Sequence, residues 1–216
     1  MPPCPDFVLS MSFPTRLFLI RHGEVEARYQ RVFGGRIDME LSPRGLSQAR
    51  ALADHLRPIH FDAVYASPMK RAQQTLAPLV ALNGYLPVNL QALREVDFGD
   101  WTGLSWEQVK ERFTASAFDW LAHLDRNDIP NAESANAFRA RVEPCLQQIV
   151  AQHGGQSVAV VCHGGVIRLL LAVLLELPLP KMANFEIDYA SLTVVDHAPG
   201  RTEVQLLNFT PWREQP

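Results

Sequence analysis

Two histidines in this sequence stand where they could do chemistry, because each comes directly after a short apolar run. His22 follows "RLFLIR", His163 follows "SVAVVC", and a glycine comes next in both places. A neutral imidazole can attack phosphorus or bind a metal ion. Metal binding is the weaker hypothesis, because the chain has no "HExxH" motif and no Cys/His spacing typical of zinc sites. A further alternative is that both residues only end strands at the surface.

Three arginines occupy comparable positions. Arg21 precedes the first histidine, Arg71 lies in "SPMKRAQQT" just after another strand-like run, and Arg168 lies one turn beyond the second histidine. The carboxyl ends of neighbouring strands in a doubly wound sheet converge on one crevice. Helix N-termini at that edge favour an anion, and arginine side chains bind phosphate oxygens strongly. Together these residues predict a phosphoryl pocket, although Arg71 and Arg168 taken singly could be ordinary helix residues.

The elements that must position these residues follow from the apolar pattern of the first ninety residues. A helix is expected over 42–58, because Ser42 can cap it, Pro43 suits its first turn and its apolar residues recur at helical spacing. The pattern around it predicts strands over 16–20, 62–67 and about 86–90, and a second helix over 68–82. This alternation predicts a mainly parallel sheet covered by helices.

The second half of the chain continues the pattern after an irregular segment. Residues 91–128 predict a loop with two short helices, in which the tryptophans are expected to be core or pocket wall. We then expect a helix over 133–153, a strand over 157–162, a helix over 166–176, and an antiparallel hairpin of 190–197 and 202–209. The domain is expected to cover residues 16–216 after a flexible extension at 1–15, in which Met11 could be the biological start.

Composition disfavours several classes of function. The chain has 216 residues, a net charge of -3 and no run of basic residues, so no nucleic-acid partner is expected. Its most apolar stretch is interrupted by Arg168 and Glu176 and is too short to cross a bilayer, so no membrane partner is expected either. Three unpatterned cysteines suit a cytoplasmic protein. We expect no metal and no cofactor, and the oligomeric state is left open.

Five motifs give the chain a resemblance to a known family. They are "RHGE" (21–24), "LSPRGLSQA" (41–49), "SPMKRAQQT" (67–75), "LREVDFGDWTG" (93–103) and "HGGVIR" (163–168). In this order they resemble the histidine phosphatase superfamily, also called the phosphoglycerate mutase-like family. Each motif alone is weak, but the five together are highly specific and extend over most of the chain. The resemblance implies a three-layer α/β/α fold with a mixed, mostly parallel central sheet.

Carried over residue by residue, the resemblance also implies catalytic roles. His22 is the expected phosphorylated nucleophile, Glu95 is the expected acid/base, and Arg21, Arg71 and His163 are expected to hold the phosphate. The implied activity is that of a metal-independent phosphomonoesterase, which hydrolyses a small phosphorylated metabolite through a phosphohistidine. Glu24 is the second candidate for the acid.

The same chemistry can be argued from the residues themselves. A histidine nucleophile needs its other ring nitrogen held in the N–H form by an acceptor. A backbone carbonyl can do this, and Gly23 lets the main chain come close. The arginines and His163 would neutralise charge on the phosphoryl oxygens, while Glu95 would protonate the leaving oxygen and then activate water.

The chain departs from the family pattern on the substrate side of the site. Val25 and Arg28 stand where many members have Ser or Thr followed by Asn, and the common "PGGES" reads "PNAES" over 130–134. The candidate substrate-binding residues are Glu24, Arg28, Asn131, Glu133, Ser134 and Arg168. Within the family, "PNAES" together with "HGGVIR" is most similar to α-ribazole-5'-phosphate phosphatase-like members.

Two alternative functions are a cofactor-dependent phosphoglycerate mutase and a phosphate-binding regulator without catalysis. A silent regulator is hard to reconcile with the full set of expected catalytic residues. A mutase must exclude water from its phosphorylated intermediate. Family mutases carry a longer segment between the acid/base motif and the second histidine than this chain has between Glu95 and His163. The compact spacing therefore favours hydrolysis.

Overall fold

A mixed six-stranded sheet forms the centre of the computed structural model, which describes residues 13–116 and 119–213. The strand order is β3-β2-β4-β1-β5-β6, in which β5 runs antiparallel to both of its neighbours and the other pairings are parallel. The strands are β1 (Thr15–Arg21), β2 (Ala63–Ala66), β3 (Val88–Asn89), β4 (Ser157–Cys162), β5 (Leu192–Ala198) and β6 (Arg201–Phe209). The predicted mixed, mostly parallel sheet is confirmed. Most of the expected extension at 1–15 lies outside the described residues.

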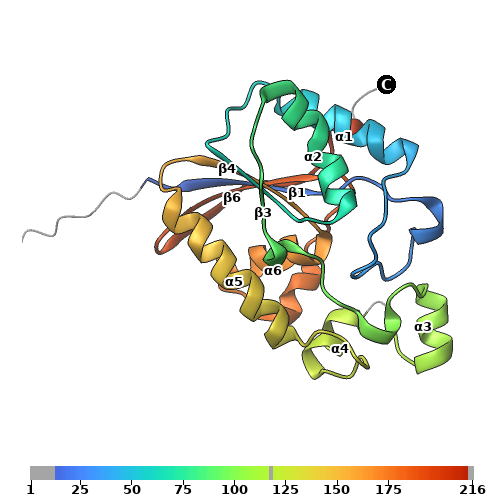
Figure 1. The fold of residues 1–216 in the computed structure, drawn as a ribbon. Coiled ribbons are helices and arrows are strands. Elements are labelled where there is room, and N and C mark those ends of the chain that lie inside the picture. Colours follow the sequence, from blue (N-terminus) through green and yellow to red (C-terminus); the bar gives the residue numbers. More distant parts are fainter. Residues whose placement is uncertain (1–12, 117–118, 214–216) are drawn as a thin grey trace, which may run out of the picture.

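Helices cover both faces of this sheet (Figure 1). Two of them pack on one face, and two others pack on the opposite face together with the short helices of the irregular segment. The first group is α1 (Pro43–Leu56) and α2 (Lys70–Asn83), and the second is α5 (Ala135–Gln152) and α6 (Gly164–Leu174), with α3 (Trp106–Phe113) and α4 (Trp120–Arg126) beside them. This arrangement is the predicted three-layer α/β/α fold.

The period-two alternation of β1 divides the core into two halves. Leu17 and Leu19 belong to the cluster under α5 and α6, whereas Phe18 and Ile20 belong to the cluster under α1 and α2. All four side chains are buried. Successive side chains of a strand point to opposite faces. A run of consecutive apolar residues, such as 17–20 in β1, is therefore buried only where both faces of the sheet are covered. Its burial fixes the position of the residues that follow its carboxyl end.

The predicted start of the first helix agrees with the structure because a capping residue specifies it. Ser42 caps α1 by accepting a hydrogen bond from the Gly45 N–H at 3.0 Å, and Pro43 is the first helical residue, as predicted. By contrast, α6 starts at Gly164, two residues before the predicted start at 166. Glycine has a low helix propensity, so the apolar pattern alone placed the start too late.

The predicted C-terminal hairpin is also confirmed. β5 and β6 pair antiparallel, and Ala198 and Arg201 close the turn. β5 lies between β1 and β6, so of the two hairpin strands β6 is the one at an edge of the sheet. The antiparallel direction of β5 makes it start beside the carboxyl end of β1, where Ile20 faces Leu192. The residues just before β5 are thereby brought to the same edge as His22.

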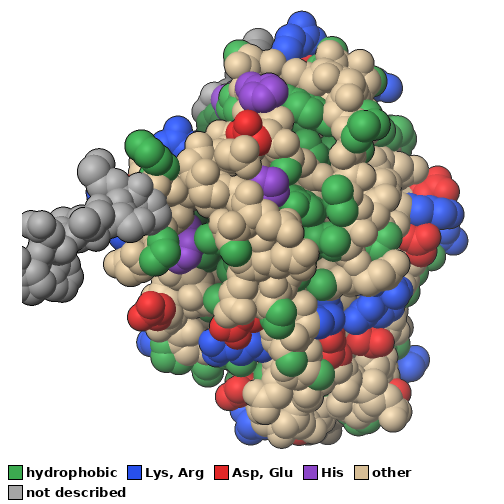
Figure 2. All heavy atoms as spheres, turned by 60° about the vertical axis from the view of Figure 1, so that its left-hand side comes forward, with side chains coloured by type: hydrophobic (Ala, Val, Ile, Leu, Met, Phe, Trp, Pro, Cys, Tyr) green, Lys and Arg blue, Asp and Glu red, His purple; other side chains and the backbone are tan. Residues whose placement is uncertain are grey.

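The surface carries charges of both signs. On the face that Figure 2 shows, basic side chains lie beside acidic ones rather than in a patch of their own. The exposed pair of Arg139 and Glu143, one turn apart on α5, is an example, with 2.6 Å between Nε and Oε2. Among the described residues, no helix combines the length and the apolar character needed to cross a membrane.

Candidate active site

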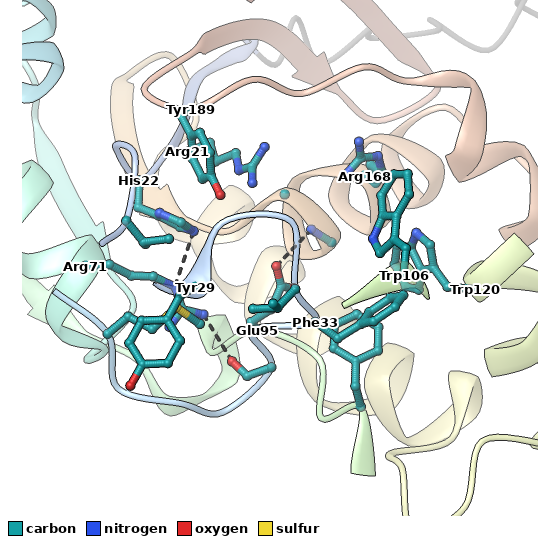
Figure 3. Close-up of a pocket in the computed structure, with 18 residues that line it drawn as sticks. Arg21, His22, Tyr29, Phe33, Arg71, Glu95, Trp106, Trp120, Arg168 and Tyr189 are labelled. Carbon is teal, nitrogen blue, oxygen red and sulfur yellow. Dashed lines mark hydrogen bonds between the residues drawn. The ribbon is translucent and has the colours of Figure 1, made fainter. Parts of the chain in front are cut away.

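A pocket lies at the carboxyl edge of the sheet, where the ends of β1, β4 and β2 converge (Figure 3). His22 follows β1, His163 follows β4, and Arg71 lies in the first turn of the helix after β2. Glu95 comes from the irregular segment after β3 and reaches the pocket from the side of α6. The fold therefore brings together two histidines, His22 and His163, that lie far apart in the sequence.

His22 is held in one tautomer by the main chain. Its Nδ1 lies 2.8 Å from the carbonyl oxygen of Gly23, which can only accept, so Nδ1 carries the proton and Nε2 carries the lone pair. A side chain at Gly23 would not fit, because its Cβ would lie 2.7 Å from the Gly45 carbonyl oxygen. The glycine therefore permits the close backbone approach that orients the imidazole.

Arg71 lines the pocket and contacts both histidines. Its Nε lies 3.2 Å from Nε2 of His22 and 3.2 Å from Nδ1 of His163. The two Nη atoms donate to the carbonyls of Ile37 and Gly35, at 2.7 and 3.1 Å. Burial lowers the pKa of Arg71 to about 10, which still leaves the guanidinium charged at neutral pH. A fixed cation thus stands beside both imidazoles.

Both histidines are kept neutral by their surroundings. Burial, followed by the charges of Arg71 and Arg21, holds the pKa of His22 well below its ordinary value of 6.5, and burial and Arg71 do the same to the pKa of His163. His163 also lies 2.7 Å from the Ser67 hydroxyl through Nε2. Since its Nδ1 accepts from Arg71, Nε2 carries the proton and donates to this hydroxyl. A neutral His22 is the nucleophilic form of the imidazole.

These lowered pKa values predict how stability depends on pH. The unfolded chain protonates both histidines near pH 6.5, whereas the folded chain keeps them neutral. The free energy of unfolding is therefore not reduced by these two residues above pH 6.5, and it falls as the pH drops below that value. We expect the free energy of unfolding to fall toward acid with a slope of up to about 1.4 kcal/mol per pH unit for each histidine. Urea unfolding at pH 7.5 and 5.5 measures the difference.

The matched variant for this measurement is His22→Gln, which removes one of the two buried titrating groups. Its loss of stability between pH 7.5 and 5.5 should be smaller than that of the wild-type protein. Equal losses in the two proteins would contradict the expected contribution of His22.

Arg21 approaches the pocket from the other side. Its Nη1 donates to the Ile187 carbonyl at 2.6 Å, and its guanidinium lies 4.1 Å from the ring centre of Tyr189. Its Nε is buried and has no hydrogen-bond partner among the described residues. Arg168, whose Nε donates to the Phe185 carbonyl at 2.8 Å, also lines the pocket. Three arginines and one carboxylate therefore line the pocket, which gives it a positive character suited to an anion.

The carboxylate of Glu95 is held by two backbone N–H groups. Oε1 accepts from Val96 at 3.0 Å, and Oε2 accepts from Gly165 at 3.2 Å, in the first turn of α6. A Cβ at Gly165 would lie 2.5 Å from Oε1, so only glycine leaves room for the carboxylate at this place. Figure 3 shows Glu95 between the His22 end of the pocket and the aromatic side chains at its other end. The carboxylate can thus reach a group bound between the two ends.

Of the six candidate substrate-binding residues, Arg168 is the one that lines the pocket. Glu24 accepts a hydrogen bond from the Ser42 hydroxyl at 2.8 Å, and Arg28 lies on the surface with Glu26 at 3.2 Å. Neither contributes to the pocket wall. Their roles with substrate stay predictions.

The other three candidates come from "PNAES" and make contacts within the protein. Asn131 donates to Asp100 at 2.9 Å, Ser134 caps α5, and Glu133 binds Arg141 through both carboxylate oxygens. The lining of the pocket includes none of the three. Their predicted contact with substrate likewise remains a prediction.

Several residues that line the pocket were not predicted from the sequence. They are aromatic or apolar side chains from irregular segments, and the chief ones are Tyr29, Phe33, Phe98 and Tyr189. Trp106 and Trp120 also line the pocket, whereas Trp101 is buried in the core, as the prediction of core and pocket wall allowed. Tyr189 precedes β5, which starts beside the carboxyl end of β1, so its place in the pocket follows from the strand order. The described residues contain no group of three His, Cys, Asp or Glu side chains placed to hold a metal.

Comparison with known proteins identifies the family of the chain. A model of the family described as the histidine phosphatase superfamily (branch 1) matches residues 17–210. Phosphoserine phosphatase 1 of Hydrogenobacter thermophilus is 31% identical over 199 residues, covering 90% of this chain and 92% of that protein. The adenosylcobalamin/alpha-ribazole phosphatase of Salmonella typhimurium is 33% identical over 208 residues, covering 93% and 100%.

A solved structure has the same fold. The alpha-ribazole phosphatase from Shigella flexneri superposes with a TM-score of 0.80 and 29% identity, over 90% of this chain and 96% of that one. The sequence similarity, the fold and the family model agree over nearly the whole described chain. The chain therefore belongs to the histidine phosphatase superfamily and is a phosphatase, as its five motifs predicted.

Proposed function

We propose that this phosphatase is a phosphomonoesterase that forms a phosphohistidine on Nε2 of His22. The observation that carries the proposal is the tautomer of His22. Its Nδ1 proton is committed to the Gly23 carbonyl, and its Nε2 lone pair lies in the pocket, 3.2 Å from the Nε of Arg71. A neutral, oriented imidazole beside a fixed cation suits attack on a phosphate monoester.

The proposed reaction has two halves. In the first, Nε2 of His22 forms a bond to phosphorus, the P–O bond to the leaving group breaks, and a protonated Glu95 gives its proton to the leaving oxygen. In the second, the Glu95 carboxylate takes a proton from a water molecule, whose oxygen attacks phosphorus and breaks the P–N bond. Inorganic phosphate leaves, and both residues return to their starting states.

The arginines carry the electrostatic part of the proposal. Arg21 and Arg71, with His163, would bind the equatorial phosphoryl oxygens and neutralise the charge that they carry in the transition state. The buried Nε of Arg21 supplies an N–H group without a partner among the described residues, and Arg71 supplies its charge. No step uses a metal, so turnover of an aryl phosphate should persist in excess chelator.

The far end of the pocket supports a leaving group with a flat aromatic part. Phe33, Trp106 and Trp120 lie there with Arg168, away from His22 and beyond Glu95 (Figure 3). Glu95 is the one acidic residue among the described residues that line the pocket. The ammonium group of an amino-acid substrate would therefore have no second carboxylate there with which to form an ion pair. α-Ribazole-5'-phosphate, a ribonucleoside 5'-phosphate with a benzimidazole base, has the required shape. We propose a substrate of this kind.

This substrate assignment predicts that kcat/KM differs between two phosphate esters that have the same kind of leaving oxygen. α-Ribazole-5'-phosphate and ribose 5-phosphate differ at C1 of the sugar, where ribose 5-phosphate carries a hydroxyl in place of the base. Stacking of a base on aromatic side chains contributes about 1–3 kcal/mol, so we expect kcat/KM for the nucleotide to be higher by about 5- to 150-fold. Release of inorganic phosphate measures both, and O-phosphoserine should be a poor substrate in the same assay.

Trp120→Leu should reduce the ratio of the two kcat/KM values toward one, with little effect on ribose 5-phosphate. Phe13→Leu, at an exposed residue outside the pocket, provides the matched aromatic-to-aliphatic control. Equal kcat/KM values for the two phosphates in the wild-type enzyme, or a preference for O-phosphoserine, would contradict the substrate proposal while leaving the phosphohistidine step intact.

A further inference from the structure

Arg141 on α5 uses every N–H of its guanidinium within the protein. Its Nη1 donates to the carbonyls of Ala92 and Arg94, at 2.6 and 2.7 Å. Its Nη2 donates to the carbonyl of Glu95 at 3.1 Å and to Glu133 Oε2 at 2.9 Å, and its Nε donates to Glu133 Oε1 at 2.6 Å. A guanidinium has five N–H donors, and all five are engaged here.

Glu133 is equally committed. Both of its carboxylate oxygens bind Arg141, and Oε2 also accepts from the backbone N–H of Asp97 at 3.3 Å. Arg36 lies 3.5 Å from the same oxygen. The side chains of Arg141 and Glu133 are 20% and 11% exposed, so the pair is largely withdrawn from water. Hydrogen bonding to Arg141 holds the pKa of Glu133 below its ordinary value, against the opposing effect of burial.

The segment held by Arg141 is anchored in the core by Leu93 and Val96 but has little regular secondary structure. Residues 91–93 form a single 3-10 turn, and Arg94 and Glu95 lie outside any helix or strand. Within the described part of the chain, no backbone N–H donates to the carbonyls of Ala92, Arg94 and Glu95. Three carbonyls that would otherwise lack a partner in the protein therefore converge on one cation.

The last of these carbonyls belongs to the residue that supplies the pocket carboxylate. The Glu95 main chain is held by Arg141 on α5, and its side chain is held by the Gly165 N–H on α6 at 3.2 Å. We infer that Arg141, oriented by Glu133, is a positioning residue that fixes the Glu95 carboxylate relative to the leaving oxygen. The inference rests on the proposed acid role of Glu95.

The experiment compares Arg141→Lys with wild type on two phosphates. Lysine keeps the charge opposite Glu133, but its single nitrogen cannot span three carbonyls and a carboxylate. A displacement of about 1 Å in a catalytic group can cost about 100-fold. We therefore expect kcat/KM for ribose 5-phosphate, whose leaving oxygen needs a proton, to fall by about 100-fold. The value for 4-nitrophenyl phosphate, whose leaving group needs none, should change by less than about three-fold.

Two further variants make the result specific. Glu133→Gln, which removes the charged partner that orients Arg141, should show the same discrimination between the two substrates. Arg139→Lys, in an exposed ion pair with Glu143 on the same helix, should change neither value. A merely structural role would lower both kcat/KM values together by reducing the folded fraction, which thermal unfolding reports independently.

The outcomes separate this inference from the proposed function. If Glu95→Gln discriminates between the two phosphates but Arg141→Lys and Glu133→Gln do not, the positioning role is wrong and the acid role stands. If Glu95→Gln itself affects both phosphates equally, the acid role fails and the inference falls with it.

Discussion

His22→Ala is expected to lower turnover of every phosphate monoester by about three orders of magnitude or more. The covalent step needs a lone pair at Nε2, and no second nucleophile stands in the same place. His163 does not replace it, because its Nε2 is protonated and donates to Ser67, so its lone pair is on Nδ1 and not at the position of the His22 Nε2. Steady-state release of 4-nitrophenol and of inorganic phosphate measures the loss.

The His22→Ala protein should still fold, because the residue follows β1 rather than lying within it. Its far-UV circular dichroism and thermal unfolding are expected to remain cooperative. His60→Ala, at a largely exposed histidine near Asp62, is the control and should keep full activity. Activity within about ten-fold of wild type in a folded His22→Ala protein would contradict the nucleophile assignment.

Glu95→Gln is expected to separate substrates by their leaving groups. For ribose 5-phosphate, the loss of the proton donor should lower kcat/KM by about 10²–10⁴-fold. For 4-nitrophenyl phosphate, kcat/KM should stay close to wild type, since this parameter covers events only up to departure of a leaving group that needs no proton. Its kcat should nevertheless fall, because water attack on the phosphohistidine also depends on Glu95.

Gly165→Ala tests the same carboxylate without altering it. The added Cβ would lie 2.5 Å from Oε1 of Glu95 and displace the end of a flexible side chain, which leaves the fold intact. We expect kcat/KM for ribose 5-phosphate to fall more than kcat/KM for 4-nitrophenyl phosphate, as in Glu95→Gln. Equal losses on alkyl and aryl phosphates in both variants would indicate a different acid, and Glu24 would be tested next.

Much of the fold follows from local chemistry. The alternation of apolar runs with helix-start signals such as Ser42–Pro43 predicted the strands and helices and the parallel sheet. The position of the hairpin beside β1 did not follow, because strand order depends on how whole elements pack and leaves no mark in the local pattern. As a result Tyr189, which reaches the pocket through that strand order, was missed.

The two ends of the pocket differ in how far the sequence could predict them. The phosphate end comes from residues fixed to strand ends and helix starts, so their convergence follows from the topology of the sheet. The aromatic end comes from a loop and short helices, such as those carrying Phe33 and Trp120, whose placement depends on tertiary packing. The Arg141–Glu133 pair is also invisible in the sequence, because charged residues on a helix are usually exposed and their targets here are backbone carbonyls.

The most direct test is to trap the phosphorylated enzyme and locate the phosphate. Enzyme mixed with 4-nitrophenyl phosphate is quenched in alkali within milliseconds, digested and mapped by mass spectrometry, with wild type, Glu95→Gln and His22→Ala compared in parallel. We expect one phosphate per chain on His22, transient in wild type, accumulating in Glu95→Gln and absent from His22→Ala. A long-lived phosphoenzyme in wild type that interconverts 3- and 2-phosphoglycerate would instead show a mutase, and phosphate on any other residue, or none in Glu95→Gln, would contradict the phosphohistidine at His22.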